Sequence, residues 1–246
     1  MSQMLRILLI DDNPDDRTLV VRELRRSFAD LDIVQVADAD GFAQALQTGG
    51  FDLVITDYQL RWTDGVTVLR TIKNCWPDCP VVMFTATGSE EVAVEAMKAG
   101  LNDYVLKSPK HFTRLTAAVR LALEQTQQRQ ALKEAETRYR SLFDGVPVGL
   151  YRSTPLGQFL DANPALVQML GYPDRESLLV VKMAHLYVNA EEYRHWQTTV
   201  ERDGVAQNFE VQIRRRDGTT IWVRNSARVV RDGENQVLHY EGAMVA

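Results

Sequence analysis

The chain has 246 residues, of which 45% are hydrophobic and 25% charged, a balance typical of globular proteins with room for two domains. No apolar run approaches the roughly 18 residues of a membrane span and no signal peptide opens the chain, so we expect a cytoplasmic protein without a membrane partner. Residues 1–125 carry 13 Lys and Arg against 18 Asp and Glu, and residues 126–246 carry 15 of each, so neither half has the basic excess of a direct nucleic-acid binder.

Strand and helix patterns alternate through the first half. The strand patterns, several of them nearly continuous Val, Ile and Leu, lie at 5–10, 33–37, 51–56, 81–86 and 103–107. The helical patterns lie near 15–28, 39–48, 64–75 and 89–99, with another from about 111. Strands without polar alternation are typical of a parallel sheet that helices cover on both faces. The pattern therefore predicts a doubly wound α/β domain with a five-stranded parallel sheet.

A long helix is predicted between the two halves. Residues 111–143 contain no Gly or Pro, and as one helix they would extend for roughly 50 Å. A thin seam follows 3-4 spacing through Leu115, Ala118, Ala122, Gln125, Arg129, Leu132, Glu136, Tyr139 and Phe143. We interpret this seam as a weak parallel coiled coil, with a solitary exposed helix as the alternative.

The second half has a different pattern. Residues 148–154 and 157–163 predict a hairpin around Pro155–Gly157. Short helices are predicted at 163–170, 175–180 and 189–204, and final strands at 208–216, 220–231 and 237–246. Asp-Gly pairs mark the turns between those strands, and apolar residues alternate with polar ones along them. This half therefore predicts an α+β domain with an antiparallel sheet.

Charged and hydroxyl side chains end several of the predicted parallel strands. Asp11 and Asp12 follow the first strand, Asp57 the third, while Thr85 and Lys107 end the fourth and fifth. The carboxyl ends of parallel strands meet at one sheet edge, where ligands gather. Three carboxylates favour Mg²⁺, and a lysine with a hydroxyl suits a phosphoryl group. Because a carboxylate can attack phosphorus, the cluster predicts a phosphoryl-accepting aspartate.

Four motifs carry a family resemblance: "ILLIDDNPDD", "VITDYQL", "MFTATGS" and "DYVLKSP". Over about residues 4–125 they resemble, in order, the flavodoxin-like receiver domain of response regulators. The resemblance implies that Asp57 is the phosphoacceptor. It implies that Asp12, Asp57 and the backbone carbonyl of Gln59 bind Mg²⁺ directly, with Asp11 beside them. One departure is "YQLRWTDG", where the family commonly has Met-Pro soon after the phosphoacceptor.

The same resemblance implies how phosphorylation is read. Thr85 would be the switch hydroxyl, Lys107 would pair with the phosphoryl group, and Tyr104 would be the rotating aromatic. A phosphatase of the haloacid-dehalogenase type is an alternative from another class, but Gln59 stands where its second acid would be. Cys75 and Cys79 could form a weak metal or redox pair; without a second ligand cluster we interpret them as reduced thiols.

The motifs "VGLYRSTPLGQFLDANPAL", "MLGYPDRESLL" and "FEVQIRRRDGTTIWVRNSARVVRD" resemble a PAS domain. The resemblance implies ligand sensing, dimerisation or relay through flanking helices. Flavin photochemistry needs a reactive cysteine, and no Cys lies beyond Cys79. His195, with His185 nearby, could bind haem, but we expect no cofactor in this domain. We assign its aromatic residues to the core: Trp196, Trp222, Phe159 and Tyr187.

These predictions combine into a receiver at 1–125, a helical linker at 126–143 and a PAS domain at 144–246. We expect a non-enzymatic response regulator that takes its phosphoryl group from a histidine kinase or phosphotransfer protein. We also expect a homodimer through the linker helix and the PAS domain. The alternative is a PAS-based ligand or haem sensor with a modulatory receiver. Because no output-module pattern follows the last strand, either could be part of a longer hybrid kinase or diguanylate cyclase.

Overall fold

The computed structural model describes residues 4–86, 90–108 and 112–246. The chain divides into two compact units, Met1–Lys133 and Glu134–Ala246, and each is described by itself. The predicted helix start at His111 and the end of the "MFTATGS" motif, residues 87–89, lie outside the described residues. None of the helices in the described ranges is both long and apolar enough to cross a membrane.

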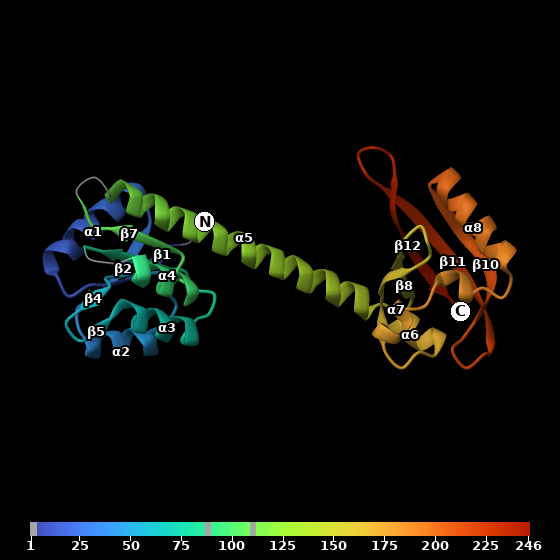
Figure 1. Cartoon of the computed structure of the whole chain (residues 1–246), viewed down its shortest axis with the longest axis horizontal. Coiled ribbons are helices and arrows are strands. Elements are labelled where there is room, and N and C mark those ends of the chain that lie inside the picture. The colour runs from blue at the N-terminus through green and yellow to red at the C-terminus, as the bar shows by residue number, and fades with distance from the viewer. Residues whose placement is uncertain (1–3, 87–89, 109–111) are drawn as a thin grey trace. The chain divides into compact units, whose positions relative to one another are not determined.

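The first unit is built on a five-stranded parallel sheet, ordered β2-β1-β3-β6-β7. Figure 1 shows helices on both sides of this sheet. Its strands are β1 Leu5–Ile10, β2 Leu31–Val36, β3 Leu53–Thr56, β6 Val81–Thr85 and β7 Asp103–Leu106. Its helices are α1 Pro14–Ser27, α2 Ala39–Thr48, α3 Gly65–Cys75, α4 Glu90–Lys98 and the start of α5 Phe112–Gly145. The predicted doubly wound parallel sheet is therefore confirmed.

Helices cover both faces of this sheet, and the strands alternate between two cores. In β1, Ile7 and Leu9 pack with α1 and α5, whereas Leu8 and Ile10 pack with α2, α3 and α4. All four side chains are at most 1% exposed. Burial on both faces explains why the strands lack polar alternation.

A small hairpin that the sequence patterns did not predict follows β3. It pairs β4 Gln59–Leu60 with β5 Thr63–Asp64. Gly65 closes it against the end of β3, and a Cβ placed there would lie 2.4 Å from the backbone oxygen of Asp57. Only glycine allows this close approach, so Gly65 lets the hairpin pack beside Asp57.

The coiled-coil seam predicted along the long helix is wrong at its first three positions. Leu115, Ala118 and Ala122 are at most 4% exposed and belong to the core of the first unit. A 3-4 apolar spacing also describes the core-facing side of an amphipathic helix, so the pattern could not distinguish the two. The exposed large apolar residues of α5 are Leu121, Leu132, Tyr139 and Leu142, and two of them, Leu132 and Tyr139, belong to the predicted seam.

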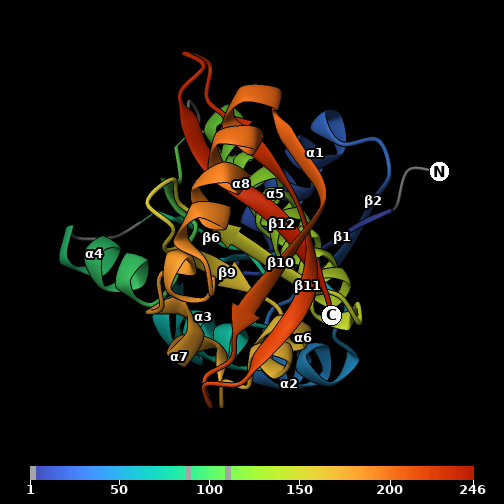
Figure 2. The ribbon, with the colours of Figure 1, turned by 90° about the vertical axis from the view of Figure 1, so that its right-hand side faces the viewer.

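The second unit has an antiparallel sheet in the order β10-β11-β12-β8-β9. The strands are β8 Gly149–Ser153, β9 Phe159–Ala162, β10 Val205–Arg214, β11 Thr220–Arg231 and β12 Val237–Val245. The helices are α6 Pro164–Leu170, α7 Arg175–Leu179, the short 3-10 turn η1 Met183–His185 and α8 Ala190–Asp203. Figure 2 shows α8 lying across the sheet. This confirms the predicted α+β domain.

The core of the second unit is rich in aromatic residues, but Trp222 is not among them. Trp196, Phe159 and Tyr187 are at most 4% exposed, as predicted, whereas Trp222 is 63% exposed. Successive strand residues point to opposite faces, and β11 turns Val223 toward the core. Trp222 therefore points away from the core, and its assignment to the core was wrong.

Candidate functional site

The loop after β1 places two carboxylates and a helix start at the edge of the parallel sheet. Asp11 is 2% exposed, and its Oδ1 accepts a hydrogen bond from the N–H of Asn13 at 2.8 Å. Asn13 in turn caps α1 through its side chain, and Pro14 occupies the first turn, where a missing N–H costs nothing. Starting α1 here brings Asp16 to the same edge.

Lys107 lies at the centre of the site. Its ammonium donates to Oδ2 of Asp57 at 2.6 Å, to Oδ2 of Asp11 at 2.7 Å and to Oδ2 of Asp16 at 2.8 Å. An ammonium has three hydrogens, so each finds a carboxylate. The Lys107 side chain is 9% exposed, which makes these charge-assisted bonds stronger than surface ion pairs.

Burial and the neighbouring charges shift the pKa values of this cluster in opposite directions. Burial alone would lower the pKa of Lys107, but its hydrogen bonds to Asp11, Asp16 and Asp57 raise it above the usual value. Burial raises the pKa of Asp11, and the neighbouring Lys107 offsets part of that rise. The lysine is thus held protonated, and the carboxylates depend on it for compensation.

The cluster has the chemistry of a site for a hard divalent cation. One oxygen each of Asp11, Asp16 and Asp57 lies within 4.8 Å of the other two. Carboxylate oxygens are the ligands that Mg²⁺ prefers, and an ammonium already sits among them. The donor set therefore fits Mg²⁺. Asp16 was not predicted, because it lies in the first turn of α1 and not at the end of a strand.

The structure places Asp12 slightly apart from this cluster. Its Oδ2 accepts a hydrogen bond from the backbone N–H of Arg61 at 2.8 Å and lies 3.5 Å from Nε of the same residue. Arg61 belongs to the segment that departs from the family pattern, and a proline could not donate this bond. Gln59 donates its N–H to Oδ1 of Asp57 at 3.2 Å. The metal-binding roles of Asp12 and the Gln59 carbonyl stay predictions.

The other two predicted residues lie on the neighbouring strands. Thr85 ends β6 and is fully buried, and its backbone oxygen accepts the N–H of Lys107 at 2.6 Å. Tyr104 is half-buried on β7, opposite Met83. Burial raises the pKa of Tyr104, with smaller contributions from Tyr58 and Asp57. Their switching roles also stay predictions.

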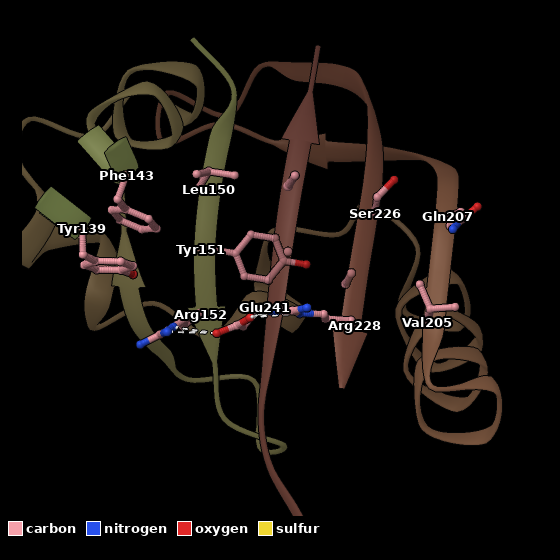
Figure 3. Close-up of a pocket in the computed structure, with 13 residues that line it drawn as sticks. Tyr139, Phe143, Leu150, Tyr151, Arg152, Val205, Gln207, Ser226, Arg228 and Glu241 are labelled. Atoms are coloured by element: carbon pink, nitrogen blue, oxygen red, sulfur yellow. Dashed lines mark hydrogen bonds and ion pairs between the residues drawn. The ribbon is translucent and has the colours of Figure 1, made fainter. Parts of the chain in front are cut away.

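The second unit has a shallow groove on the sheet face away from the core. Its volume is about 410 Å³. The rings of Tyr139 and Phe143 stack at one side, with centroids 5.5 Å apart. Across the strands, Glu241 pairs with Arg152 at 2.9 Å and with Arg228 at 2.7 Å (Figure 3). Aromatic rings therefore line one side of the groove, and ion-paired side chains line the other.

Inside the same unit a neutral polar chain crosses the core. Tyr151 donates to Oδ1 of Asn225 at 2.9 Å, and Nδ2 of Asn225 donates to the hydroxyl of Tyr187 at 3.0 Å. Burial raises the pKa of both tyrosines. His195 and His185 are exposed on the outside, and the His195 ring lies 5.4 Å from that of Phe209. Neither histidine points into this core, a placement that does not favour haem ligation from within.

Two family models match the chain. Residues 7–120 match the response regulator receiver domain, and residues 159–244 match the PAS fold. The first match spans the acidic sheet edge, and the second spans most of the antiparallel unit. The chain is therefore a two-component signalling protein, in which a receiver domain is followed by a PAS domain.

Three curated relatives define the family further. The chemotaxis protein CheY of Pseudomonas aeruginosa is 32% identical over 108 residues, which cover 42% of this chain and 84% of CheY. The transcriptional regulatory protein ZraR of Salmonella typhimurium is 35% identical, covering 50% of this chain and 27% of ZraR. The sensor histidine kinase TmoS of Ectopseudomonas mendocina is 23% identical, covering 96% of this chain and 28% of TmoS. The chain belongs to the response regulator receiver family. It spans about a quarter of the length of ZraR and of TmoS.

Proposed function

We propose that this chain is a response regulator that accepts a phosphoryl group on Asp57 from a histidine kinase or a phosphotransfer protein. The observation that carries the proposal is Asp57 at the sheet edge, 9% exposed and 2.6 Å from the ammonium of Lys107. A carboxylate oxygen of Asp57 forms the new bond to phosphorus while the bond from phosphorus to the donor breaks. The donor leaves with the electron pair and takes up a proton. The chain itself acts as the acceptor and not as an enzyme on a separate substrate.

The residues around Asp57 have distinct tasks in this transfer. Lys107 supplies a fixed positive charge for the phosphoryl oxygens, and its raised pKa keeps it protonated. Asp11, Asp12, Asp57 and the Gln59 carbonyl would hold Mg²⁺, which when bound supplies charge neutralisation on the phosphoryl oxygens. Thr85 and Tyr104 would respond to the new group and alter the surface of the receiver.

We further propose that α5 relays this change to the PAS domain, within a division into a receiver (1–125), a linker (126–143) and a PAS domain (144–246). The exposed side of α5 carries a heptad-like row: Leu121, Gln125, Gln128, Leu132, Ala135, Tyr139 and Leu142. This row shares Gln125, Leu132 and Tyr139 with the predicted seam. It supports a weak parallel homodimer, because its polar members limit how tightly two helices associate. Weak association is what a phosphorylation signal of a few kcal/mol could shift.

Phosphorylation with a small donor tests the acceptor. The full chain, incubated with acetyl phosphate and Mg²⁺, should gain the mass of one phosphoryl group, and Asp57→Asn should gain none. Asp52→Asn is the matched control, because Asp52 lies at the opposite end of β3 from Asp57, where its side chain accepts the backbone N–H of Arg6. Phosphoryl incorporation by Asp57→Asn at the level of the unmodified chain would refute the assignment.

A further inference from the structure

Asp16 is a charged member of the site that the proposed transfer does not use. Its Oδ2 lies 2.8 Å from the Lys107 ammonium and belongs to the group of three carboxylates within 4.8 Å of one another. It reaches the site from α1, not from a strand end. Its side chain is 28% exposed, compared with 3% for Asp11 and 11% for Asp57.

The Lys107 ammonium and a divalent cation would compete for the same oxygens. Asp11 and Asp57 would serve the metal in the proposed function, and both now bind Lys107. An ammonium that loses two carboxylates inside a protein is costly unless another partner compensates it. The positive charges of the ammonium and of the cation would also repel each other strongly when both bind the same carboxylates. Lys107 therefore needs a partner that the metal does not take.

We infer that Asp16 is a positioning residue that keeps the Lys107 ammonium in the site when a divalent cation occupies Asp11 and Asp57. It is suited to this task because it is the most exposed of the three carboxylates and comes from a separate element. The inference rests on the proposed function, since it concerns the same cation and the same lysine.

The same contact has a consequence after phosphoryl transfer. Phosphorylated Asp57 is an acyl phosphate and no longer has a carboxylate charge, so one of the three carboxylate partners of Lys107 is lost. Asp16 still holds the ammonium at the edge of the site, where one of its hydrogens can donate to a phosphoryl oxygen. Asp16 thus acts on the phosphoryl group through Lys107 and does not touch the reacting atoms.

Magnesium titration of the full chain by calorimetry tests this role. Asp16→Asn should bind Mg²⁺ about tenfold more weakly than the unmodified chain, because the ammonium then stays on Asp11 and Asp57. Asp15→Asn removes the same charge from the adjacent exposed position of α1 and should change the affinity by less than about twofold. Asp16→Glu keeps the carboxylate and should restore most of the affinity.

A double-mutant cycle shows whether Asp16 acts through Lys107. In a Lys107→Met background, Asp16→Asn should weaken Mg²⁺ binding by only about twofold. An unchanged tenfold loss in that background would overturn the inference, since Asp16 would then act on the metal directly. Equal affinities of Asp16→Asn and the unmodified chain would overturn it too.

Phosphorylation of the same samples separates this inference from the proposed function. An unmodified chain that binds Mg²⁺ but gains no phosphoryl group on Asp57 contradicts the proposed function. A chain that is phosphorylated normally, with no effect of Asp16→Asn on Mg²⁺ affinity, contradicts only the role of Asp16. Thermal unfolding of each variant checks that it is folded. If Asp16→Asn does not fold, Asp16→Ser takes its place in the titration.

Discussion

The two units bury polar side chains in different ways. The receiver buries charge: Asp11 and Asp57 lie at the sheet edge, with the ammonium of Lys107 between them. The PAS unit buries neutral groups. Asn163 accepts the N–H groups of Leu150 and Leu166, and its amide nitrogen donates to the backbone oxygens of Phe143 and Val148.

This difference separates a part that can change state from a part that holds its shape. A buried charge cluster responds to a proton, a cation or a phosphoryl group, because each alters the balance of charge. A neutral amide that has its hydrogen-bond partners does not gain or lose a proton at ordinary pH. Asn163 also ties the end of α5, at Phe143, to the first strand of the PAS sheet. A change that reaches the end of this helix would therefore reach a firmly held strand.

The largest effect is expected from a change in the neutral core. Trp196 is fully buried and its ring packs against those of Tyr187, Tyr193 and Tyr240. Trp196→Ala should lower the free energy of unfolding of the PAS unit by about 4 kcal/mol. Chemical denaturation followed by circular dichroism measures this loss. Phosphorylation of Asp57 should persist, and its loss would show that the two units are not independent in this respect.

A somewhat smaller effect, dependent on pH, is expected from the charged site. Lys107→Met leaves three carboxylates without their cation and should destabilise the receiver by about 3 kcal/mol at pH 7. Burial already raises the pKa of Asp11, and this change removes the group that opposes the rise. A carboxyl with a raised pKa binds its proton more tightly when folded, so the variant should regain stability as the pH falls.

The unmodified receiver should behave differently over the same pH range. The raised pKa of Lys107 means that its contribution to stability is complete below the unfolded pKa of about 10.4 and is lost only as the pH rises through the higher folded value. Denaturation at about pH 5 and pH 7 compares the two proteins. A variant no more stable at the lower pH would contradict this account of Asp11.

The smallest effect is expected at the exposed rim of the site. The Arg61 side chain is 86% exposed and lies 3.5 Å from Oδ2 of Asp12. Exposed ion pairs contribute little, so Arg61→Ala should tighten Mg²⁺ binding by only about twofold. The change removes the guanidinium charge beside Asp12, while the backbone N–H of residue 61 still donates to its carboxylate. Calorimetric titration measures the change. Weaker binding in Arg61→Ala would show that the guanidinium does not compete with the cation.

The sequence predicted most of the fold because periodicity reports burial. Strands buried on both faces, and strands with one wet face, differ in their apolar pattern, and both sheets followed from it. Trp222 was misassigned because it was placed in the core for its large apolar side chain, although its position in β11 alternates with that of the buried Val223. Leu115 was misassigned because a core face and a coiled-coil seam share one spacing.

The site was predictable where strand ends supplied its residues. Asp11, Asp57 and Lys107 follow strands of one parallel sheet and do lie together. Asp16 belongs to a helix, and only the tertiary structure brings it to Lys107. The contact of Asp12 with the Arg61 N–H depends on the β4–β5 hairpin, whose two-residue strands give no periodic signal.

Crosslinking along α5 tests the central claim, that phosphorylation of the receiver changes how this helix associates. The chain would carry Leu132→Cys, or Glu134→Cys on another face of α5, in a background with Cys75→Ser and Cys79→Ala. Beryllofluoride stands in for the phosphoryl group. We predict that Leu132→Cys crosslinks two copies more than Glu134→Cys does, and that beryllofluoride changes the extent at position 132. No crosslink at position 132, or the same extent with and without beryllofluoride, would contradict the claim.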